Sequence, residues 1–323
     1  MGQRFVIGQA TDTGLKRSGG ANQDAIGTAE CLRCEDPCPI LILADGMGGY
    51  FGGEIASRIA VETVKEIFSA SDPEKDGFDA VLRECIDGAH RNIMEQAAGD
   101  EPLRNMGSTL VLAVPTAKSV RIGNVGDSRA YLITARGEIS QISYDHSFVM
   151  EQVRAGLITK EEADRHPRKN VLTMSLSGMR GKVDPYLAEI PWEAGDTVLI
   201  CSDGLWGPVP EEQIRSTVVS MEPQDAADRL TELANKNGGP DNISVLIARN
   251  CGAEPAPDKT GETEKAAAPE GKRQNSRRGR AALLGLILIL VILGLLLYFT
   301  NNKTEPLQSL IRDGARFFSE GGI

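Results

Sequence analysis

Short strands in close succession constrain the fold of this chain more than any other feature of its sequence. Runs of β-branched and other apolar residues, bounded by turn signals, predict strands at 4–11, 40–44, 108–114, 119–125, 129–134, 138–143, 186–190, 197–201 and 243–249. Several of these strands are joined by short turns that contain Gly, which leave no room for a helical crossover. We therefore expect antiparallel pairing.

Amphipathic helices accompany these strands. Apolar residues recur at helical spacing in 53–68 and 78–97, and two more helices are predicted near 210–219 and 224–236. Helices of this kind bury one face against a sheet. The sequence therefore predicts an α+β domain over residues 1–250, a four-layer α-β-β-α sandwich in which two packed antiparallel sheets are flanked by helices.

Charge is distributed unevenly along the chain. Of 35 Lys and Arg and 45 Asp and Glu, residues 251–323 hold 10 and 8, which leaves 25 basic and 37 acidic groups in residues 1–250. An acidic domain repels the phosphate backbone of nucleic acids, so we expect no nucleic-acid partner. Clustered carboxylates suit hard divalent cations instead.

A run of twenty uncharged residues, 281–300 (AALLGLILILVILGLLLYFT), predicts a transmembrane helix. At about 1.5 Å per residue it spans roughly 30 Å, the thickness of a bilayer's hydrocarbon core. The preceding segment 251–280 has the composition of a flexible linker and ends in a cluster of Lys and Arg. The positive-inside rule then places residues 1–280 in the cytoplasm and leaves 301–323 as a short extracytoplasmic tail. We expect a single-pass protein of the cell membrane.

Four Asp residues stand where an apolar strand meets a glycine or a turn. Asp45 lies in LADGMGG, Asp127 in NVGDSRAYL, Asp203 in CSDGLW and Asp241 in GGPDNISVLI. Asp beside Gly is a common turn signature, so each of them taken alone has a structural explanation. Buried together, however, these carboxylates would need cations, and oxygen-rich clusters select Mg²⁺ or Mn²⁺.

Seven motifs occur in order along residues 1–250: TDTGLKRSGGANQDA at 11–25, LADGMGG at 43–49, MGSTL at 106–110, NVGDSRAYL at 124–132, DHS at 145–147, CSDGLW at 201–206 and GGPDNISVLI at 238–247. In these motifs the chain resembles the metal-dependent serine/threonine protein phosphatases, the type 2C phosphatases, in their bacterial form. The resemblance implies hydrolysis of phosphoserine and phosphothreonine in proteins by a water that bridges two divalent ions, Mn²⁺ or Mg²⁺. It also implies phosphorylated proteins and their Ser/Thr kinases as partners, and we expect a monomer that counteracts those kinases at the membrane.

The resemblance also implies a set of metal ligands. Asp45 matches the carboxylate that bridges both ions, and Gly46 matches the residue whose backbone carbonyl binds the second ion. Asp203 and Asp241 match the ligands of the first ion. Asp127 matches a ligand of a third, weaker ion.

Two further residues match functional positions of the family, and three depart from its pattern. Asp24 matches the acid that orders metal-bound waters, and Arg17 matches the arginine that binds the substrate phosphate. Met47 stands where eukaryotic members commonly have His, a proposed general acid, so a water or another residue must take that role. Gly207 stands where they have a second ligand of the third ion, and Gln23 replaces a frequent Glu.

Residues 145–172 resemble the flap subdomain that borders the substrate cleft in bacterial members. At its start, Asp145, His146 and Ser147 suggest a hydrolase triad, but consecutive residues cannot all point at one reaction centre. We expect His146 to make structural hydrogen bonds at the base of the flap.

Other interpretations remain beside this one. The segment that starts at Cys85 (CIDGAHR) has the spacing of a cysteine-based phosphatase, but it lies within a predicted helix, where we expect a core cysteine. Cys31, Cys34 and Cys38, between the first two predicted strands, are either part of a zinc site or thiols of a hairpin. Two alternative functions are an inactive phosphatase-fold scaffold at the membrane and a dedicated phosphatase of one signalling regulator.

Overall fold

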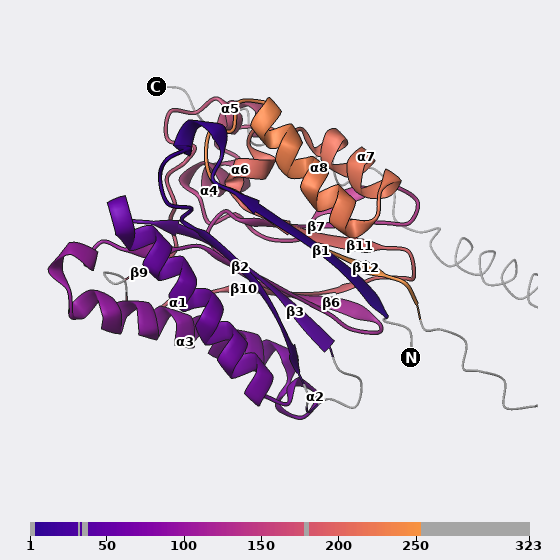
Figure 1. Ribbon diagram of the computed structural model, residues 1–323, viewed down its shortest axis with the longest axis horizontal. Coiled ribbons are helices and arrows are strands. Elements are labelled where there is room, and N and C mark those ends of the chain that lie inside the picture. The colour runs from indigo at the N-terminus through magenta and orange to yellow at the C-terminus, as the bar shows by residue number, and fades with distance from the viewer. Residues whose placement is uncertain (1–3, 32, 34–37, 178–180, 253–323) are drawn as a thin grey trace, which may run out of the picture. The chain divides into compact units, whose positions relative to one another are not determined.

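The strands pair into two antiparallel sheets in the computed structural model, which describes residues 4–31, 33, 38–177 and 181–252 (Figure 1). The five-stranded sheet has the order β1-β12-β11-β7-β8, with strands β1 Phe5–Asp12, β7 Arg129–Ile133, β8 Ile139–Gln141, β11 Thr197–Cys201 and β12 Ile243–Asn250. The seven-stranded sheet has the order β10-β6-β5-β3-β4-β9, and β2 also pairs with β3. Its strands are β2 Asp24–Cys31, β3 Cys38–Met47, β4 Gly107–Ser108, β5 Leu110–Pro115, β6 Ser119–Val125, β9 Leu176–Ser177 and β10 Tyr186–Pro191.

Helices cover the outer face of each sheet, as Figure 1 shows. Helices α1 (Gly49–Ala70) and α3 (Phe78–Ala98) pack against the seven-stranded sheet. Helices α7 (Glu211–Ser220) and α8 (Pro223–Lys236) pack against the five-stranded one. The predicted four-layer sandwich is therefore confirmed. Further short helices are α2 Pro73–Asp76, α6 Asp203–Trp206, η1 Leu15–Arg17 and η2 Glu101–Leu103.

Three layers of apolar side chains fill the three interfaces between these four layers. Strand β3 contributes side chains to two of these apolar layers, because successive side chains of a strand point to opposite faces. Its Leu41 and Leu43 pack between the two sheets, whereas Ile40 and Ile42 pack toward α1 and α3. A strand buried on both faces has a continuous apolar sequence, which is why ILILA was recognisable as a strand.

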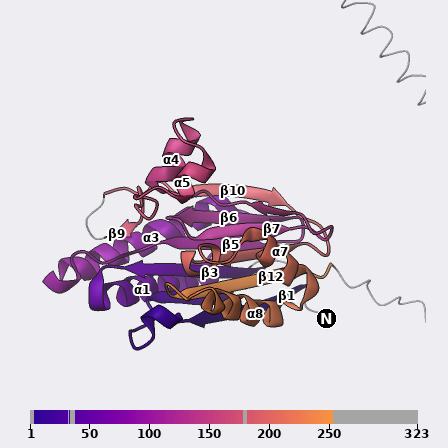
Figure 2. The same cartoon turned by 90° about the horizontal axis from the view of Figure 1, so that it is seen from above.

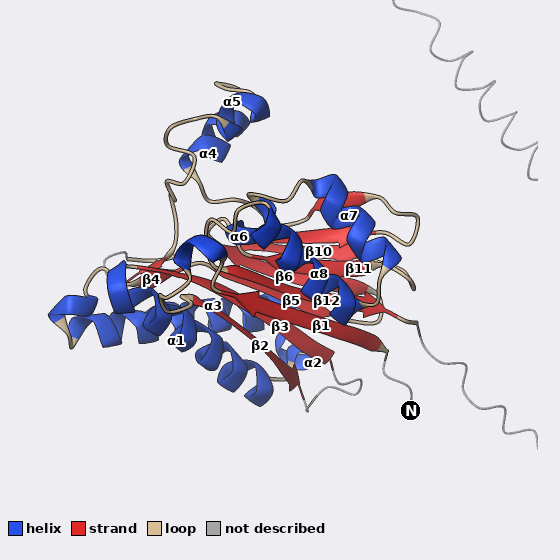
Figure 3. Cartoon of the chain, turned by 45° about the horizontal axis from the view of Figure 1, so that its top comes forward, coloured by secondary structure: helices blue, strands red, loops and turns tan. Residues whose placement is uncertain are grey.

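The predicted flap contains two short helices, α4 (Phe148–Arg154) and α5 (Lys160–Asp164), which stand away from the sandwich in Figure 2 and Figure 3. Each begins at a side-chain cap. The hydroxyl of Ser147 accepts a hydrogen bond from the backbone of Met150, and Thr159 forms a capping box with Glu162. Local capping accounts for helices that bury little surface against the rest of the domain.

Some predicted elements differ in the structure. Strand β2 was not predicted, because DAIGTAEC is poor in β-branched residues; it is held by pairing with β3 along its whole length. Helix α1 begins at Gly49 rather than at 53. The predicted strand 138–143 is only Ile139–Gln141, and the predicted strand 108–114 is divided into β4 and β5.

The cysteines near the N-terminus also lie differently from the prediction. Cys31 and Cys38 do not lie in a loop between strands: they end β2 and begin β3, directly opposite each other, and both are buried. Cys34 lies outside the described residues, so the zinc hypothesis stays a prediction.

The predicted transmembrane helix at 281–300 and the tail at 301–323 lie outside the described residues, as does all of the linker 251–280 except its first two residues. Within the described ranges, no helix is both long and apolar enough to span a bilayer.

Candidate metal centre

The acids that the motifs singled out lie together. An open cleft of about 960 Å³ lies at one end of both sheets, where β3, β6 and β11 end and β7 and β12 begin. Six of the predicted functional residues line this cleft: Arg17, Asp45, Gly46, Asp127, Asp203 and Asp241. Asp24 is buried beside them at the start of β2, opposite Asp45 in the β2–β3 pair. The structure therefore brings the whole predicted set to one place.

The backbone of Asp45 is fixed from the side of β4. Its carbonyl oxygen accepts hydrogen bonds from the backbone of Thr109 at 2.8 Å and from the hydroxyl of Ser108 at 3.0 Å. Its N–H donates to the hydroxyl of Thr109 at 3.0 Å. The break between β4 and β5 falls at Thr109, so this departure from the predicted strand serves the site.

Glycine is required at position 46. A Cβ atom added there would lie 2.1 Å from the carbonyl oxygen of Gly53 and 2.5 Å from that of Gln23. The N–H of Gly46 donates to the same carbonyl of Gln23 at 3.1 Å. The end of β3 is thus packed so closely between β2 and α1 that only a residue without a side chain fits.

A second close approach sets Asp203 beside Asp241. Asp203 is the first residue of α6, and Gly204 follows it. A Cβ atom on Gly204 would lie 1.9 Å from the carbonyl oxygen of Asn242, so the backbone of α6 lies directly on the turn before β12. The acids that precede these two contacting residues are therefore neighbours, although Asp203 and Asp241 are 38 positions apart in the sequence.

Two polar residues that the sequence analysis missed tie these segments together. The hydroxyl of Ser202 donates to Oδ2 of Asp24 at 2.8 Å and accepts from the N–H of Ser244 at 3.0 Å. The side-chain oxygen of Asn242 accepts from the backbone of Gln23 at 2.9 Å. Ser202 and Asn242 each stand next to a predicted acid within the motifs CSDGLW and GGPDN, which was the available signal.

Burial and mutual repulsion oppose ionisation of these acids. Burial raises the pKa of Asp45 well above its ordinary value, and the charges of four neighbours raise it further: Asp24, Asp203, Asp127 and Asp241. Burial also raises the pKa of Asp24 and of Asp127 to about 7, and that of Asp203 to about 6. Carboxylates gathered in this way ionise less readily than isolated ones, and a nearby positive charge favours their ionised form.

The residues fit a hard divalent cation. The cleft offers oxygen atoms as ligands, which Mg²⁺ and Mn²⁺ prefer. Oδ1 of Asp24 is buried and accepts no hydrogen bond from any described residue. Within the described ranges, however, no three His, Cys, Asp or Glu side chains stand close enough together to hold an ion as they are placed. Two causes keep the acids apart. Their like charges repel one another, and Oδ2 of Asp241 pairs with Nη2 of Arg17 at 2.8 Å.

The predicted flap borders the cleft. Asn170 and Leu172 of the predicted flap line it, and so do Ser175, just after the flap, and Lys16, next to Arg17. Met47 also lines the cleft, and its thioether has no proton to give. Met47 therefore cannot donate a proton to a leaving group. This agrees with the inference from the sequence that a water or another residue must take that role.

The DHS motif at the base of the flap forms no triad. The carboxylate of Asp145 pairs with Arg129. Nδ1 of His146 accepts a hydrogen bond from the backbone of Gly126 at 3.2 Å, and Ser147 caps α4. Three separate structural contacts confirm the expectation for His146 and exclude the triad.

Cys85 is a core residue, as predicted. It is buried on α3 among the side chains that pack against the seven-stranded sheet, and burial raises the pKa of its thiol to about 12. A thiol with so high a pKa is not a thiolate at neutral pH, so it cannot serve as the nucleophile of a cysteine-based phosphatase.

Comparison with known proteins agrees with this site. Residues 13–238 match the family model of protein phosphatase 2C. The serine/threonine phosphatase stp of Listeria monocytogenes serovar 1/2a is 39% identical over 216 residues, which are 66% of this chain and 85% of that protein. Protein phosphatase PhpP of Streptococcus pneumoniae serotype 2 is 37% identical over 248 residues, 75% of this chain and 96% of PhpP.

Solved structures agree as well. The catalytic domain of the serine/threonine protein phosphatase PstP, solved in complex with two manganese ions, superposes with a TM-score of 0.65 at 33% identity over 76% of this chain and 97% of that one. Fold, acidic cleft and motifs together define a metal-dependent phosphoric monoester hydrolase. The chain belongs to the protein phosphatase 2C family, and it is a serine/threonine protein phosphatase of the bacterial type.

Proposed function

We propose that the acidic cleft is the active site, in which the chain removes phosphate from phosphoserine and phosphothreonine of protein substrates. The observation that supports this most directly is the meeting of Asp45, Asp203 and Asp241 in one cleft with Arg17 at its edge. Two divalent ions, when bound, supply an activated water for attack on phosphorus and neutralise charge on the phosphate. The carboxylates of these three Asp residues and the carbonyl of Gly46 would hold them.

The remaining residues of the site have separate tasks in this proposal. Asp24, held by Ser202, would accept hydrogen bonds from water molecules around the ions. Asp127 would hold a third, weaker ion. Arg17, whose side chain is 46% exposed, is free of the protein interior and can turn from Asp241 to a phosphate, where its parallel N–H groups match two oxygens.

The test of this function uses hydrolysis of a phosphothreonine peptide by the full chain. We expect activity with Mn²⁺, none with excess EDTA, and a loss of more than about a hundredfold in Asp203→Asn. Asp196→Asn is the matched control, because Asp196 is also a buried acid but lies at the other end of β11, where it accepts hydrogen bonds from Ala135 and Glu193. Activity that survives both EDTA and the Asp203 substitution contradicts the proposal.

We also propose that residues 281–300 anchor the enzyme in the cell membrane, with residues 1–280 in the cytoplasm. The uncharged run and the Lys and Arg residues before it support this. A linker of about 30 residues would then have a root-mean-square length of roughly 30 Å, which would keep the phosphatase domain near the membrane. Phosphoproteins made by Ser/Thr kinases at the membrane would be the substrates. One chain supplies every proposed ligand, so we propose that it acts as a monomer.

The anchor is tested by fractionation of cells that express the full chain or a chain ending at residue 280. We expect the full chain to stay in the membrane pellet after an alkaline carbonate wash and the shorter chain to be released. Protease added outside intact spheroplasts should leave the phosphatase domain uncut. Release of the full chain by carbonate would refute the anchor, whereas digestion from outside would refute the orientation.

A further inference from the structure

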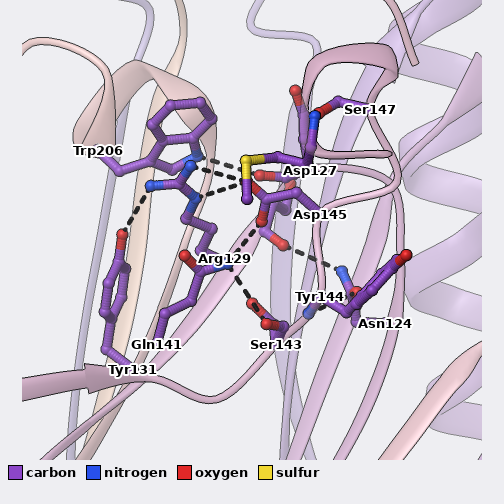
Figure 4. A network of polar contacts seen from close by, with 12 residues as sticks. Asn124, Asp127, Arg129, Tyr131, Gln141, Ser143, Tyr144, Asp145, Ser147 and Trp206 are labelled. Carbon is purple, nitrogen blue, oxygen red and sulfur yellow. Dashed lines mark hydrogen bonds and ion pairs between the residues drawn. The ribbon is translucent and has the colours of Figure 1, made fainter. Parts of the chain in front are cut away.

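A buried ion pair lies beside the cleft and takes no part in the proposed reaction. Nε and Nη2 of Arg129 both donate to Oδ2 of Asp145, at 3.0 and 2.7 Å, and the two side chains are only 16% and 2% exposed (Figure 4). Nη1 of Arg129 donates to the hydroxyl of Tyr131 at 3.2 Å. The second oxygen of Asp145 accepts from the amide of Gln141 at 2.6 Å. Both charges are therefore held in a single geometry.

Arg129 also contacts the indole of Trp206. Its guanidinium carbon lies 3.6 Å from the centroid of the Trp206 ring, which is the geometry of a cation–π contact. Nε1 of the same indole donates to the backbone carbonyl of Asp127 at 3.1 Å, as Figure 4 shows. Trp206 is the last residue of α6, whose first residue is Asp203. The indole therefore connects the helix of one proposed ligand with the backbone of another.

The peptide group that precedes Asp127 is also held by a hydrogen bond, from the residue next to Asp145 in the ion pair. His146, which follows Asp145, donates its backbone N–H to the carbonyl of Gly126 at 2.9 Å. The carbonyls of Gly126 and Asp127 belong to the two peptide groups that flank the Cα atom of Asp127. When both peptide planes are fixed, the direction in which the Asp127 side chain leaves the backbone is fixed too.

We propose that Arg129 is a positioning residue of the metal centre. Clamped by Asp145, it fixes the indole of Trp206, and Trp206 holds Asp127 in place for a divalent ion at a set position relative to Asp203. This inference rests on the proposed function, in which Asp127 is an ion ligand. Residues that orient metal ligands from outside the coordination sphere commonly change metal affinity by roughly ten- to a hundredfold when they are replaced.

Two substitutions each remove a different contact: Arg129→Lys alters the contact of Arg129 with Trp206, and Trp206→Phe removes the hydrogen bond to Asp127. Arg129→Lys keeps the buried positive charge for Asp145, but an ammonium group offers neither a planar face nor a two-pronged donor. Trp206→Phe keeps an aromatic ring for Arg129 but removes the N–H that binds Asp127. Truncation of Arg129 to Ala is less useful, because it leaves Asp145 buried without its partner and destabilises the whole domain.

Arg121 provides a matched control. Its guanidinium carbon lies 5.2 Å from the centroid of the Phe78 ring, and it pairs with Asp79 at 3.6 Å and with Glu189 at 2.9 Å. Like Arg129 it is an arginine of a strand with an aromatic and an acidic partner, but none of these four residues lines the cleft. Arg121→Lys therefore reports the general cost of replacing such an arginine.

The experiment is calorimetric titration of Mn²⁺ into the full chain without substrate. We expect Asp127→Asn to abolish the weakest binding step. Arg129→Lys and Trp206→Phe should weaken that step roughly tenfold or more, and Arg121→Lys should leave it within about twofold. In a double-mutant cycle, Arg129→Lys should have no further effect on Mn²⁺ binding in the Asp127→Asn chain, because it acts through Asp127.

The outcomes separate this inference from the function on which it rests. Unchanged Mn²⁺ binding in both Arg129→Lys and Trp206→Phe overturns the inference alone. An equal loss with and without Asp127 also overturns it, since the effect would then be a general one on the fold. If Asp127→Asn binds Mn²⁺ like the unaltered chain, then the assignment of Asp127 fails together with the inference, while the Asp203→Asn assay still decides the function.

Discussion

Replacement of Thr109 by Val tests how the structure holds Asp45. The Thr109 hydroxyl accepts a hydrogen bond from the backbone N–H of Asp45 at 3.0 Å and forms another with the hydroxyl of Ser128 at 2.8 Å. Thr109 is 1% exposed, so water cannot replace either contact. Val has nearly the same shape but no hydroxyl. The backbone hydrogen bond from Thr109 to the carbonyl of Asp45, at 2.8 Å, remains in the variant.

The loss of stability in Thr109→Val can be estimated from the groups that lose a hydrogen-bond partner. The N–H of Asp45 becomes a buried donor without an acceptor, which costs about 1–3 kcal/mol, while the Ser128 hydroxyl can rotate toward another acceptor. We therefore expect Thr109→Val to lower the free energy of unfolding by about 2 kcal/mol, a factor of about 30 in the equilibrium constant. Urea denaturation in EDTA measures this without any contribution from metal ions.

Thr109→Ser is the complementary control, because it loses the methyl group of Thr109 but keeps the hydroxyl. We expect it to retain the hydrogen bond to Asp45 and the half-maximal Mn²⁺ concentration for phosphopeptide hydrolysis, whereas Thr109→Val should raise that concentration. If Thr109→Val unfolds at the same urea concentration as the unaltered chain and needs no more Mn²⁺, then the Thr109 hydroxyl does not hold Asp45 and the account of this strand end is wrong.

Two more predictions follow from the close packing and the raised pKa values. Gly204→Ala should destabilise the domain by about 1–3 kcal/mol, since its Cβ would lie 1.9 Å from the carbonyl of Asn242; Gly99→Ala, whose Cβ would meet nothing within 3.7 Å, should be nearly neutral in the same denaturation assay. In EDTA, stability should fall as the pH rises from about 4 to about 7, because the pKa of Asp24 is raised from 3.8 to about 7 and the folded chain therefore binds this proton more tightly than the unfolded chain. Asp24→Asn, which keeps the uncharged form, should reduce this slope in thermal unfolding, and an unchanged slope would show that Asp24 is not its source.

Much of the sandwich could be predicted because its central strands are apolar on both faces. Strands β3, β11 and β12 are recognisable from sequence alone, since each is buried between two layers. Strand β2 could not be found in this way. Its sequence has little β-propensity of its own, and the pairing that runs from Asp24 opposite Asp45 to Cys31 opposite Cys38 makes it a strand.

The residues of the site likewise fall into two groups, those recognisable from their local sequence and those whose role depends on contacts with distant segments. The motifs identified Asp45, Asp127, Asp203 and Asp241, because each acid carries a distinctive neighbourhood in the sequence. The contacts of Thr109 could not be read from MGSTL, since they depend on β4 meeting the end of β3. In the same way Ser202, Asn242 and Arg129 act on segments far away in sequence, and their partners follow only from the order of the strands.

The buried acids explain why so much of the fold is devoted to this cleft. These gathered carboxylates oppose folding, because burial and repulsion by neighbouring acids disfavour the ionised forms of four of them, Asp24, Asp45, Asp127 and Asp203. Apolar burial on both faces of β3 and β11 offsets that cost, and the close contacts at Gly46 and Gly204 fix the backbone from which the side chains of Asp45 and Asp203 extend. The same repulsion that costs stability in the metal-free chain raises the affinity for a divalent cation, since a cation relieves it. Repulsion among the acids gathered at the strand ends therefore favours metal binding, and the residues that fix these strand ends maintain it.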